Sequence, residues 1–205
     1  MNKLVFATAI FISLVAVNAT SITLNDFSDN ATVIDFEGLA ATAVVSNQFA
    51  SSGILFNNVD VFSESENAPF SFNGSRNDIA TSGSNYISKR SATTVFTFTA
   101  PVTRVGAFII DPSEVSTPTR FTAFFADGGS FTIDVPRSAA TSDPAPFVGI
   151  ENLGGITSAQ ITTSNGDPVG IDDVIFETSA AVPEPTTILL LLFGLCSIVI
   201  RKRLA

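Results

Sequence analysis

The hydrophobic positions of this chain follow one pattern in its long central part and another at each end. Residues 4–17 and 188–200 are almost wholly apolar. Between them, short runs of Val, Ile, Phe and Thr are interrupted by Gly, Pro, Asn, Asp and Ser. Such runs are typical of β-strands joined by turns, and no helical period of useful length occurs among them. The pattern predicts an all-β domain with an apolar segment on either side.

The central part is expected to form eight to ten strands. Asp127-Gly128-Gly129 separates two runs and is a strong hairpin signal. Residues 63–90 are polar, with turn signals at Asn73-Gly74 and Ser82-Gly83, and predict long loops with at most one short strand. Because 19 phenylalanines can fill the space between two sheets, we expect a jelly-roll-like β-sandwich. The predicted strands are residues 32–37, 53–56, 59–62, 93–99, 104–110, 119–126, 130–135, 147–151, 156–163 and 169–177.

The N-terminal end has the three parts of a secretory signal peptide. Lys3 precedes the apolar run, and Val17-Asn18-Ala19 offers small side chains at the cleavage positions. The run is shorter than the roughly 20 residues that span a bilayer, so cleavage after Ala19 is favoured over an uncleaved anchor. Residues 1–19 are therefore predicted to be removed on export.

The C-terminal end predicts a membrane anchor with a short motif before it. Residues 188–200 form the predicted transmembrane helix, and the basic residues after it should stay on the cytoplasmic side. A buried core helix would be equally apolar, but it would not explain the terminal position or the abrupt basic end. A GPI signal fits less well, because such tails usually end in the apolar segment. The motif is Val182, Pro183, Glu184 and Pro185, and the basic tail is Arg201, Lys202 and Arg203.

The order of motif, apolar helix and basic tail resembles the PEP-CTERM sorting signal of Gram-negative bacteria, over the last 24 residues (182–205). The resemblance implies recognition by an exosortase, a membrane transpeptidase-like enzyme, and cleavage near the Pro-Glu-Pro motif. It also implies a host that makes exopolysaccharide, and a protein that leaves the inner membrane for the cell surface or a biofilm matrix. The expected organisation is a signal peptide (1–19), a β-sandwich ectodomain (20–179) and a sorting signal (180–205).

Charge and missing residue types narrow the function. Residues 20–200 hold all 19 acidic residues but only six of the ten basic ones, a net charge of −13. Such a charge disfavours nucleic acid and anionic membranes as partners. The chain has no histidine, and its single cysteine, Cys196, lies in the predicted anchor. These absences exclude Ser-His and Cys-His nucleophile pairs, so no enzymatic activity is expected. A glycan hydrolase or lyase stays an alternative, because two carboxylates suffice there.

Two pairs of acidic residues suggest a metal site. Asp35 and Glu37 flank Phe36 on a predicted strand, which would place both carboxylates on one face. Asp172 and Asp173 lie on the last predicted strand. Carboxylates without histidine or cysteine suit Ca²⁺. The pattern also resembles calcium-stabilised jelly rolls, including carbohydrate-binding modules, and implies a structural ion. The alternative is that Glu37 and Asp172 are solvent-facing strand residues and that Asp173 caps a turn.

The ligand is less constrained by the sequence. Sugar-binding modules commonly use exposed Trp or Tyr, and the chain has no Trp and only Tyr86, in a polar segment. Tyr86 is a candidate sugar contact, or else it covers the edge of the core. We expect an exported, non-catalytic envelope or matrix protein that an exosortase sorts and that associates with exopolysaccharide. The first alternative is a calcium-dependent carbohydrate-binding module.

Overall fold

The computed structural model describes residues 18–63, 80–89, 93–110, 118–136, 145–163 and 169–178. These residues form eleven strands and two short 3₁₀ helices. The strands are β1 (Thr20–Ile22), β2 (Thr32–Ile34), β3 (Val44–Val45), β4 (Ile54–Phe56), β5 (Val59–Ser63), β6 (Asn85–Ser88), β7 (Thr93–Ile110), β8 (Arg120–Phe125), β9 (Ser130–Asp134), β10 (Phe147–Thr162) and β11 (Gly170–Glu177). The 3₁₀ helices are η1 (Leu24–Asp26) and η2 (Ala50–Ser52).

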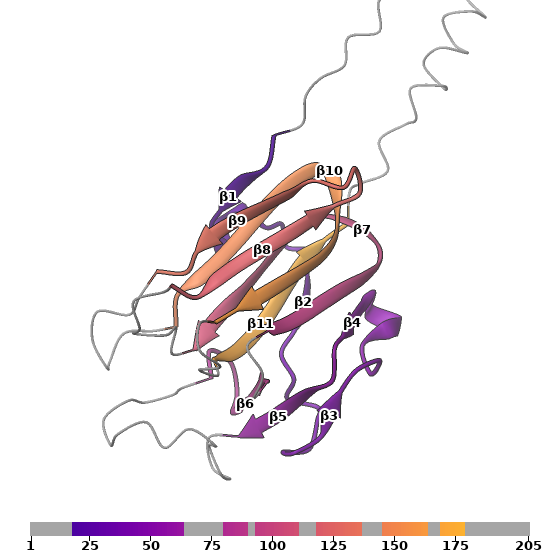
Figure 1. Ribbon diagram of the computed structural model, residues 1–205. Helices are drawn as coiled ribbons and strands as arrows, with labels where there is room; N and C mark the ends of the chain where they lie inside the picture. The colour runs from indigo at the N-terminus through magenta and orange to yellow at the C-terminus, as the bar shows by residue number, and fades with distance from the viewer. Residues whose placement is uncertain are drawn as a thin grey trace, which may run out of the picture.

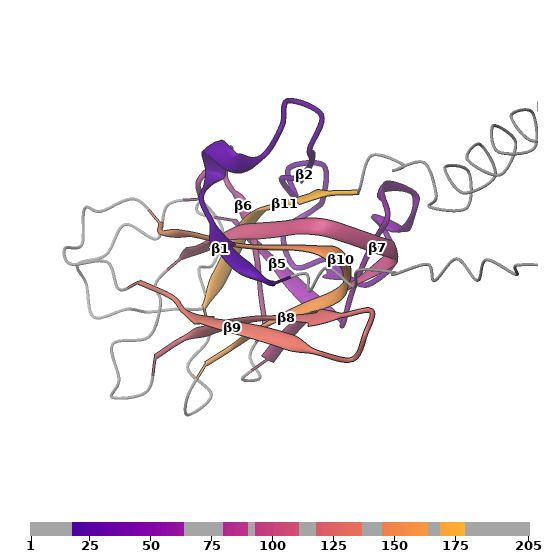
Figure 2. The same cartoon turned by 90° about the horizontal axis from the view of Figure 1, so that it is seen from above.

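All eleven strands belong to one antiparallel sheet, which folds over into two layers (Figures 1 and 2). The N-terminal half of β7 pairs with β4 and with the C-terminal half of β10, which continues to β8 and β9. The C-terminal half of β7 pairs with β11 and with the N-terminal half of β10, which also holds β1. The layers are therefore joined by two long strands that take part in both.

The long strands change layer at bends that face each other. Residues 99–101 of β7, which include Pro101, are exposed at one bend. The other bend lies in β10, where the pairing with β7 shifts between Glu151 and Ile156 and Gly155 has φ of 99°. A Cβ on Gly155 would lie 3.0 Å from the Cβ of Pro101. Glycine is needed there for its backbone angle and for the close approach.

The core lies between the layers and is aromatic at one side. Phe56 makes edge-to-face contacts with Phe36, Phe49 and Phe96, at centroid separations of 5.6, 6.1 and 5.5 Å. Along the C-terminal half of β7, alternate residues Val105, Ala107 and Ile109 are fully buried. Alternation of this kind is what a strand with one face on a core produces.

The structure confirms the all-β prediction and corrects details of the strands. β8 and β9 form the predicted hairpin at Asp127-Gly128-Gly129, with Gly128 at φ of 89°. The runs 93–99 and 104–110 are one strand, as are 147–151 and 156–163, because the ladder continues through the bends. β1 and β3 have only three and two residues and were not predicted from the sequence.

The two predicted end segments lie mostly outside the described residues. The signal peptide falls there as far as residue 17, and so does the whole sorting signal, residues 180–205. Within the described part of the chain, no helix has the length and hydrophobicity that a membrane span requires. β1 starts at Thr20, directly after the predicted cleavage site.

Candidate functional site

Two of the four candidate metal ligands, Asp172 and Asp173, lie at an interruption in the pairing along one edge of β11, and the other two, Asp35 and Glu37, follow β2. β6 pairs with Gly170 and Ile171, and β2 pairs with residues 174–176 on the same strand. Asp172 and Asp173 lie between these two stretches, where the register of β11 against β7 also shifts. Asp173 has φ of 45°, a left-handed conformation that is uncommon outside glycine. The irregular backbone places both aspartates at the position where no strand of the described residues pairs with this edge of β11.

The side chain of Asp172 supplies hydrogen-bond acceptors at the position where no described strand pairs with β11. Its Oδ2 accepts hydrogen bonds from the backbone amides of Thr81 (2.6 Å) and Ser82 (3.0 Å). Its Oδ1 accepts one from the amide of Asp173 (2.8 Å). The hydroxyl of Ser82 donates to Oδ1 of Asp173 at 2.7 Å. The segment before β6 is therefore held by side chains of β11.

Glu37 holds the next part of the same segment from the other side. Its Oε1 accepts hydrogen bonds from the amides of Ser84 (2.9 Å) and Asn85 (2.6 Å). Gly83 lies between the two bonded stretches with φ of 56°, and a Cβ there would come within 2.1 Å of Cδ of Glu37. The turn predicted at Ser82-Gly83 thus wraps around this carboxylate, and glycine is required for both backbone angle and space.

The local structure around Glu37 differs from the sequence prediction. β2 ends at Ile34, so the prediction that the strand continues through Asp35-Phe36-Glu37 is wrong. Phe36 has φ of 61°, which turns the chain away from β11. Its ring is fully buried in the aromatic core, whereas Asp35 and Glu37 are exposed. The positive φ of Phe36 thus occurs together with complete burial of its ring.

The acidic cluster, defined as Asp35, Glu37, Asp172 and Asp173, is electrostatically unfavourable in its ionised form. Asp172 is fully buried, and burial raises the pKa of its carboxyl group to about 7 despite the hydrogen bonds from Ser82, Asp173 and Thr81. Burial also raises the pKa of Asp173, and the nearby charges of Asp35 and Glu37 raise it further. Asp173 therefore lies close enough to Asp172, Asp35 and Glu37 for its charge to be repelled by theirs.

The arrangement leaves the calcium prediction untested. In the described residues, no three or more His, Cys, Asp or Glu side chains are grouped so that they could hold a metal ion. Oxygens of Asp172 and Glu37 that would face a cation instead accept amide hydrogen bonds, and Oδ1 of Asp35 accepts one from Glu37 at 3.2 Å. What the structure supports directly is that the cluster fixes residues 81–85 against β2 and β11.

Tyr86 is not an exposed sugar platform. It lies in β6 rather than in a loop, and it is only 1% exposed. Its ring packs at 6.0 Å from that of Phe62, in a small second apolar cluster with Ala80 and Ile110. The alternative interpretation, a tyrosine at the edge of the core, is the one that the structure supports.

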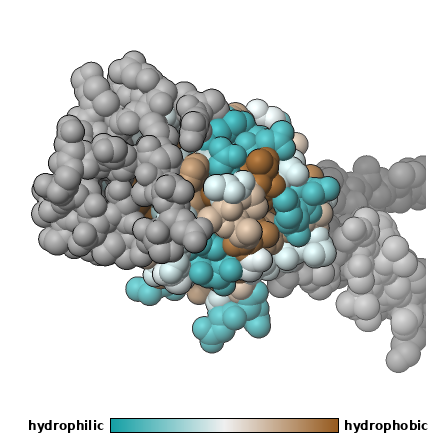
Figure 3. Space-filling model, turned by 90° about the horizontal axis from the view of Figure 1, so that it is seen from below, coloured by the Kyte–Doolittle hydropathy of each residue, from teal (hydrophilic) through white to brown (hydrophobic). Residues whose placement is uncertain are grey.

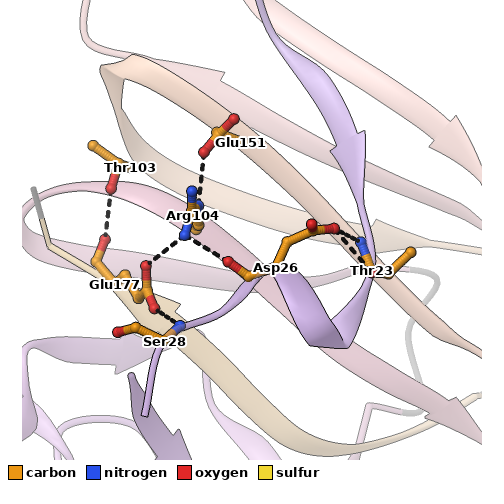
Figure 4. A network of polar contacts seen from close by, with 7 residues as sticks. All are labelled: Thr23, Asp26, Ser28, Thr103, Arg104, Glu151 and Glu177. Atoms are coloured by element: carbon orange, nitrogen blue, oxygen red, sulfur yellow. Dashed lines mark hydrogen bonds and ion pairs between the residues drawn. The ribbon is translucent and has the colours of Figure 1, made fainter. Parts of the chain in front are cut away.

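A second polar group near the other end of β11 was not identified from the sequence (Figure 4). The Arg104 network consists of Asp26, Ser28, Arg104, Glu151 and Glu177. The guanidinium of Arg104 lies 2.7 Å from Glu151 and 3.1 Å from Glu177, and it donates to the carbonyl of Asp26 at 2.5 Å. The pKa of Arg104 is raised, chiefly by its hydrogen bond to Glu151. The backbone amide of Ser28 donates to Glu177.

The network joins three strands and the N-terminal segment that follows β1. Arg104 lies on β7, Glu151 on β10 and Glu177 at the end of β11, while Asp26 and Ser28 follow β1. η1 is itself closed by Oδ2 of Asp26, which accepts from the amide and hydroxyl of Thr23 at 2.7 and 2.9 Å. An arginine inside an apolar run was the only signal in the sequence, and it does not identify its partners.

Fold and polar groups together define a small all-β domain in which the carboxyl groups of Glu37, Asp172 and Glu177 accept hydrogen bonds from backbone amides of distant segments. A match to a known family identifies the sorting signal in the C-terminal tail. The chain carries a PEP-CTERM protein-sorting motif, because the family model of that motif matches residues 181–203. The match confirms the resemblance inferred from the sequence and implies an exported protein that an exosortase processes. It covers the tail and not the strands.

Other comparisons describe the ectodomain only at a distance. The curated proteins contain no match to this chain. Among solved structures, the K2 cleaved adhesin domain of Lys-gingipain (Kgp) is 13% identical with a TM-score of 0.43, over 72% of this chain and 99% of the adhesin domain. The enzymatically active domain of tailspike protein 4 of bacteriophage CBA120 is 15% identical with a TM-score of 0.33, over 67% of this chain and 21% of that one. Both likenesses are too distant to indicate a function.

Proposed function

We propose that this chain is a non-catalytic surface or matrix protein of a Gram-negative bacterium. An exosortase processes its C-terminal tail, and its ectodomain, a β-sandwich of jelly-roll type, then associates with exopolysaccharide. The observation that carries the proposal is the sorting motif at residues 181–203. The signal peptide directs the chain to the inner membrane, and after its cleavage residues 188–200 hold the chain there until processing.

The chemistry of the ectodomain supports a non-catalytic role. The chain has no histidine, and its one cysteine lies in the tail. The most perturbed carboxyl group, that of Asp172, is fully buried and accepts three backbone hydrogen bonds. A general acid or base must reach a substrate proton, which a carboxyl group in this position cannot do. The cluster is better suited to holding the fold together outside the cell, where the domain has no disulfide to help it.

Sorting is tested with the full chain in a host with its exosortase and in the matched deletion strain. We expect a shorter product in the extracellular or surface fraction of the first strain, and an unprocessed membrane-bound form in the second. The double variant Pro183→Ala, Pro185→Ala should stay unprocessed in both strains, and Pro136→Ala is the matched control outside the motif. Equal processing with and without the exosortase would refute this part of the proposal.

Association with exopolysaccharide is tested by cosedimentation of the processed protein with matrix polysaccharide from the same host. We expect retention that survives washing with salt, because residues 20–200 carry a net charge of −13, which disfavours retention of an anionic polymer by charge alone. A charge-neutral dextran of similar length is the control polymer. Identical recovery from both polymers, or recovery from neither, would refute the association.

One observation favours a second function, a calcium-dependent carbohydrate-binding module. Asp35, Glu37 and Asp173 come close enough for their charges to raise the pKa of Asp173, and a cation would relieve that repulsion. If Ca²⁺ binds there, millimolar Ca²⁺ raises the melting temperature of EDTA-treated protein, and Glu37→Gln abolishes the rise while Asp134→Asn, at the exposed end of β9, keeps it. An unchanged melting temperature at millimolar Ca²⁺ would reject the metal and this function.

A further inference from the structure

The two ends of the described domain lie at the same end of the sheet. Strand pairing places Thr20 beside Glu151, Glu151 beside Arg104, and Arg104 beside Glu177. These four residues form one row across β1, β10, β7 and β11. Three strand spacings separate its first and last members, or about 14 Å. The first strand therefore begins, and the last strand ends, along a single edge of the molecule, at the top of Figure 1.

A second row marks the opposite end. Val44 pairs with Asp60, Asp60 with Ser88, and Ser88 with Gly170. Gly170 and Glu177 are the two ends of β11 and pair with Ile110 and Arg104 of β7, six residues apart, which corresponds to about 20 Å of strand. Figure 3 views the molecule from the end that carries β3 and β5, where hydrophobic residues are bordered by hydrophilic ones. The two rows thus define a termini end and a β3–β5 end.

The Arg104 network fixes the position at the termini end from which the C-terminal tail leaves the domain. Glu177 is held by Arg104 and by the backbone amide of Ser28, so β11 is fastened up to its last residue. Only residues 178–182 separate Glu177 from Pro183, and ten residues separate it from Ile188. These spacers reach at most about 18 and about 36 Å when fully extended.

We propose that the termini end faces the membrane and the sorting enzyme, and that the β3–β5 end is the surface presented outward to the matrix. The inference rests on the proposed function, because it uses the sorting tail as the anchor. The short spacer keeps the termini end within reach of the bilayer, and the β3–β5 end then lies farther out by about the length of β11. Before signal cleavage the N-terminal segment leaves from the same end, so both tethers impose the same orientation.

Two exposed hydrophobic residues report on the two ends. Leu153 follows Glu151 on β10, beyond the termini row, and is 68% exposed. Val44 lies in the other row and is 50% exposed. Neither belongs to the Arg104 network or to the acidic cluster. In a Cys196→Ser background, Leu153→Cys and Val44→Cys therefore provide single labelling positions with matched chemistry.

The experiment reconstitutes the full-length chain, labelled with a fluorophore at one position, into phosphatidylethanolamine and phosphatidylglycerol vesicles that contain a headgroup-linked quencher. We expect quenching at position 153 to exceed quenching at position 44 by about threefold or more. Insertion of ten Gly and Ser residues after Thr178 should reduce this difference, because the longer spacer frees the orientation. Equal quenching at both positions, or stronger quenching at position 44, would overturn the orientation.

The same vesicles separate failure of this inference from failure of the proposed function. A chain that does not float with the vesicles has no anchor in residues 188–200, which refutes the proposed sorting and the orientation with it. A chain that floats with the vesicles but shows equal quenching refutes the orientation alone. Unfolding temperatures of the labelled variants must match that of the Cys196→Ser parent, and a Leu153→Ser control establishes that the exposed leucine is not needed for folding.

Discussion

The Arg104 network and the acidic cluster, which both involve β11, compensate the charge of their carboxyl groups in different ways. In the Arg104 network, a guanidinium that is partly exposed to water compensates Glu151 and Glu177. In the acidic cluster, no cationic side chain takes part in any described contact, and backbone amides supply the compensation for Asp172 and Glu37. A guanidinium keeps its charge at every accessible pH, whereas a buried carboxyl group can escape its charge by protonation. The two groups should therefore respond differently to pH, salt and substitution.

The largest effect is expected from removing the buried carboxyl group. Asp172→Ala leaves the amides of Thr81, Ser82 and Asp173 without their acceptor, which should reduce the free energy of unfolding by about 2–4 kcal/mol. Asp172→Asn keeps one acceptor oxygen and should cost about half as much. Chemical denaturation of the purified protein in EDTA measures both. A loss for Asp172→Ala within about 0.5 kcal/mol of zero would mean that residues 81–85 do not depend on this side chain.

A pH titration in EDTA should separate the cluster from the network. The pKa of Asp172 is raised to about 7 in the folded protein, above the ordinary value of 3.8. Between these values the folded state binds the extra proton, so the stabilising contribution is complete below pH 4 and is lost as pH rises through about 7. Relative to Asp172→Asn, the wild type should lose about 1–3 kcal/mol of unfolding free energy between pH 4 and pH 8. Parallel curves for the two proteins would contradict the raised pKa.

The Arg104 network should be weaker and should depend on salt. Arg104→Ala leaves Glu151 and Glu177 facing each other without a counter-charge, and it releases the carbonyl of Asp26. We expect a loss of about 1–2 kcal/mol in unfolding free energy, because the group is partly exposed and several contacts are lost together. Arg104→Lys should recover part of it.

The salt dependence of the two losses in unfolding free energy tests this interpretation. The loss caused by Arg104→Ala should shrink in 0.5 M NaCl, since screening weakens partly exposed ion pairs. The loss caused by Asp172→Ala should not, because its hydrogen bonds are not exposed to screening in the same way. If both losses responded equally to salt, the contrast between the two groups would be lost.

The sequence allowed the fold class and the four carboxyl groups of the acidic cluster to be predicted, but no member of the Arg104 network. Alternation in the run around Phe96 and the apolar runs around Phe121 and Ile171 placed the strands, and the turn at Ser82-Gly83 was visible as a dipeptide. The sequence also identified Asp172 and Asp173 as unusual, because two adjacent carboxylates interrupt an apolar run. The interruption in strand pairing beside Asp172 and Asp173 could not be predicted from the sequence, because it depends on where β2 and β6 end. The short strands β1 and β3 were missed because two or three residues carry no measurable period.

The Arg104 network was missed for a different physical reason. Its bonded pairs are separated by 47 to 149 residues, and they meet only because β1, β10, β7 and β11 are aligned in one row. An isolated arginine on a strand predicts exposure, and only the register reveals its partners. The acidic cluster was accessible in part because two of its members are adjacent in sequence. Local patterns thus predict the residues of a site better than they predict what compensates their charge.

The smallest effect is expected from the third ion pair, and it calibrates the comparison. Arg120 lies 3.2 Å from Asp134 across β8 and β9, and the two side chains are 54% and 63% exposed. Water compensates both charges already, so Arg120→Ala should change the free energy of unfolding by less than about 0.5 kcal/mol. Denaturation of Arg120→Ala beside Arg104→Ala measures the difference. A loss at Arg120 as large as that at Arg104 would show that any cross-strand arginine stabilises this sheet, and the position of Arg104 between two carboxylates and the N-terminal segment would then explain nothing further.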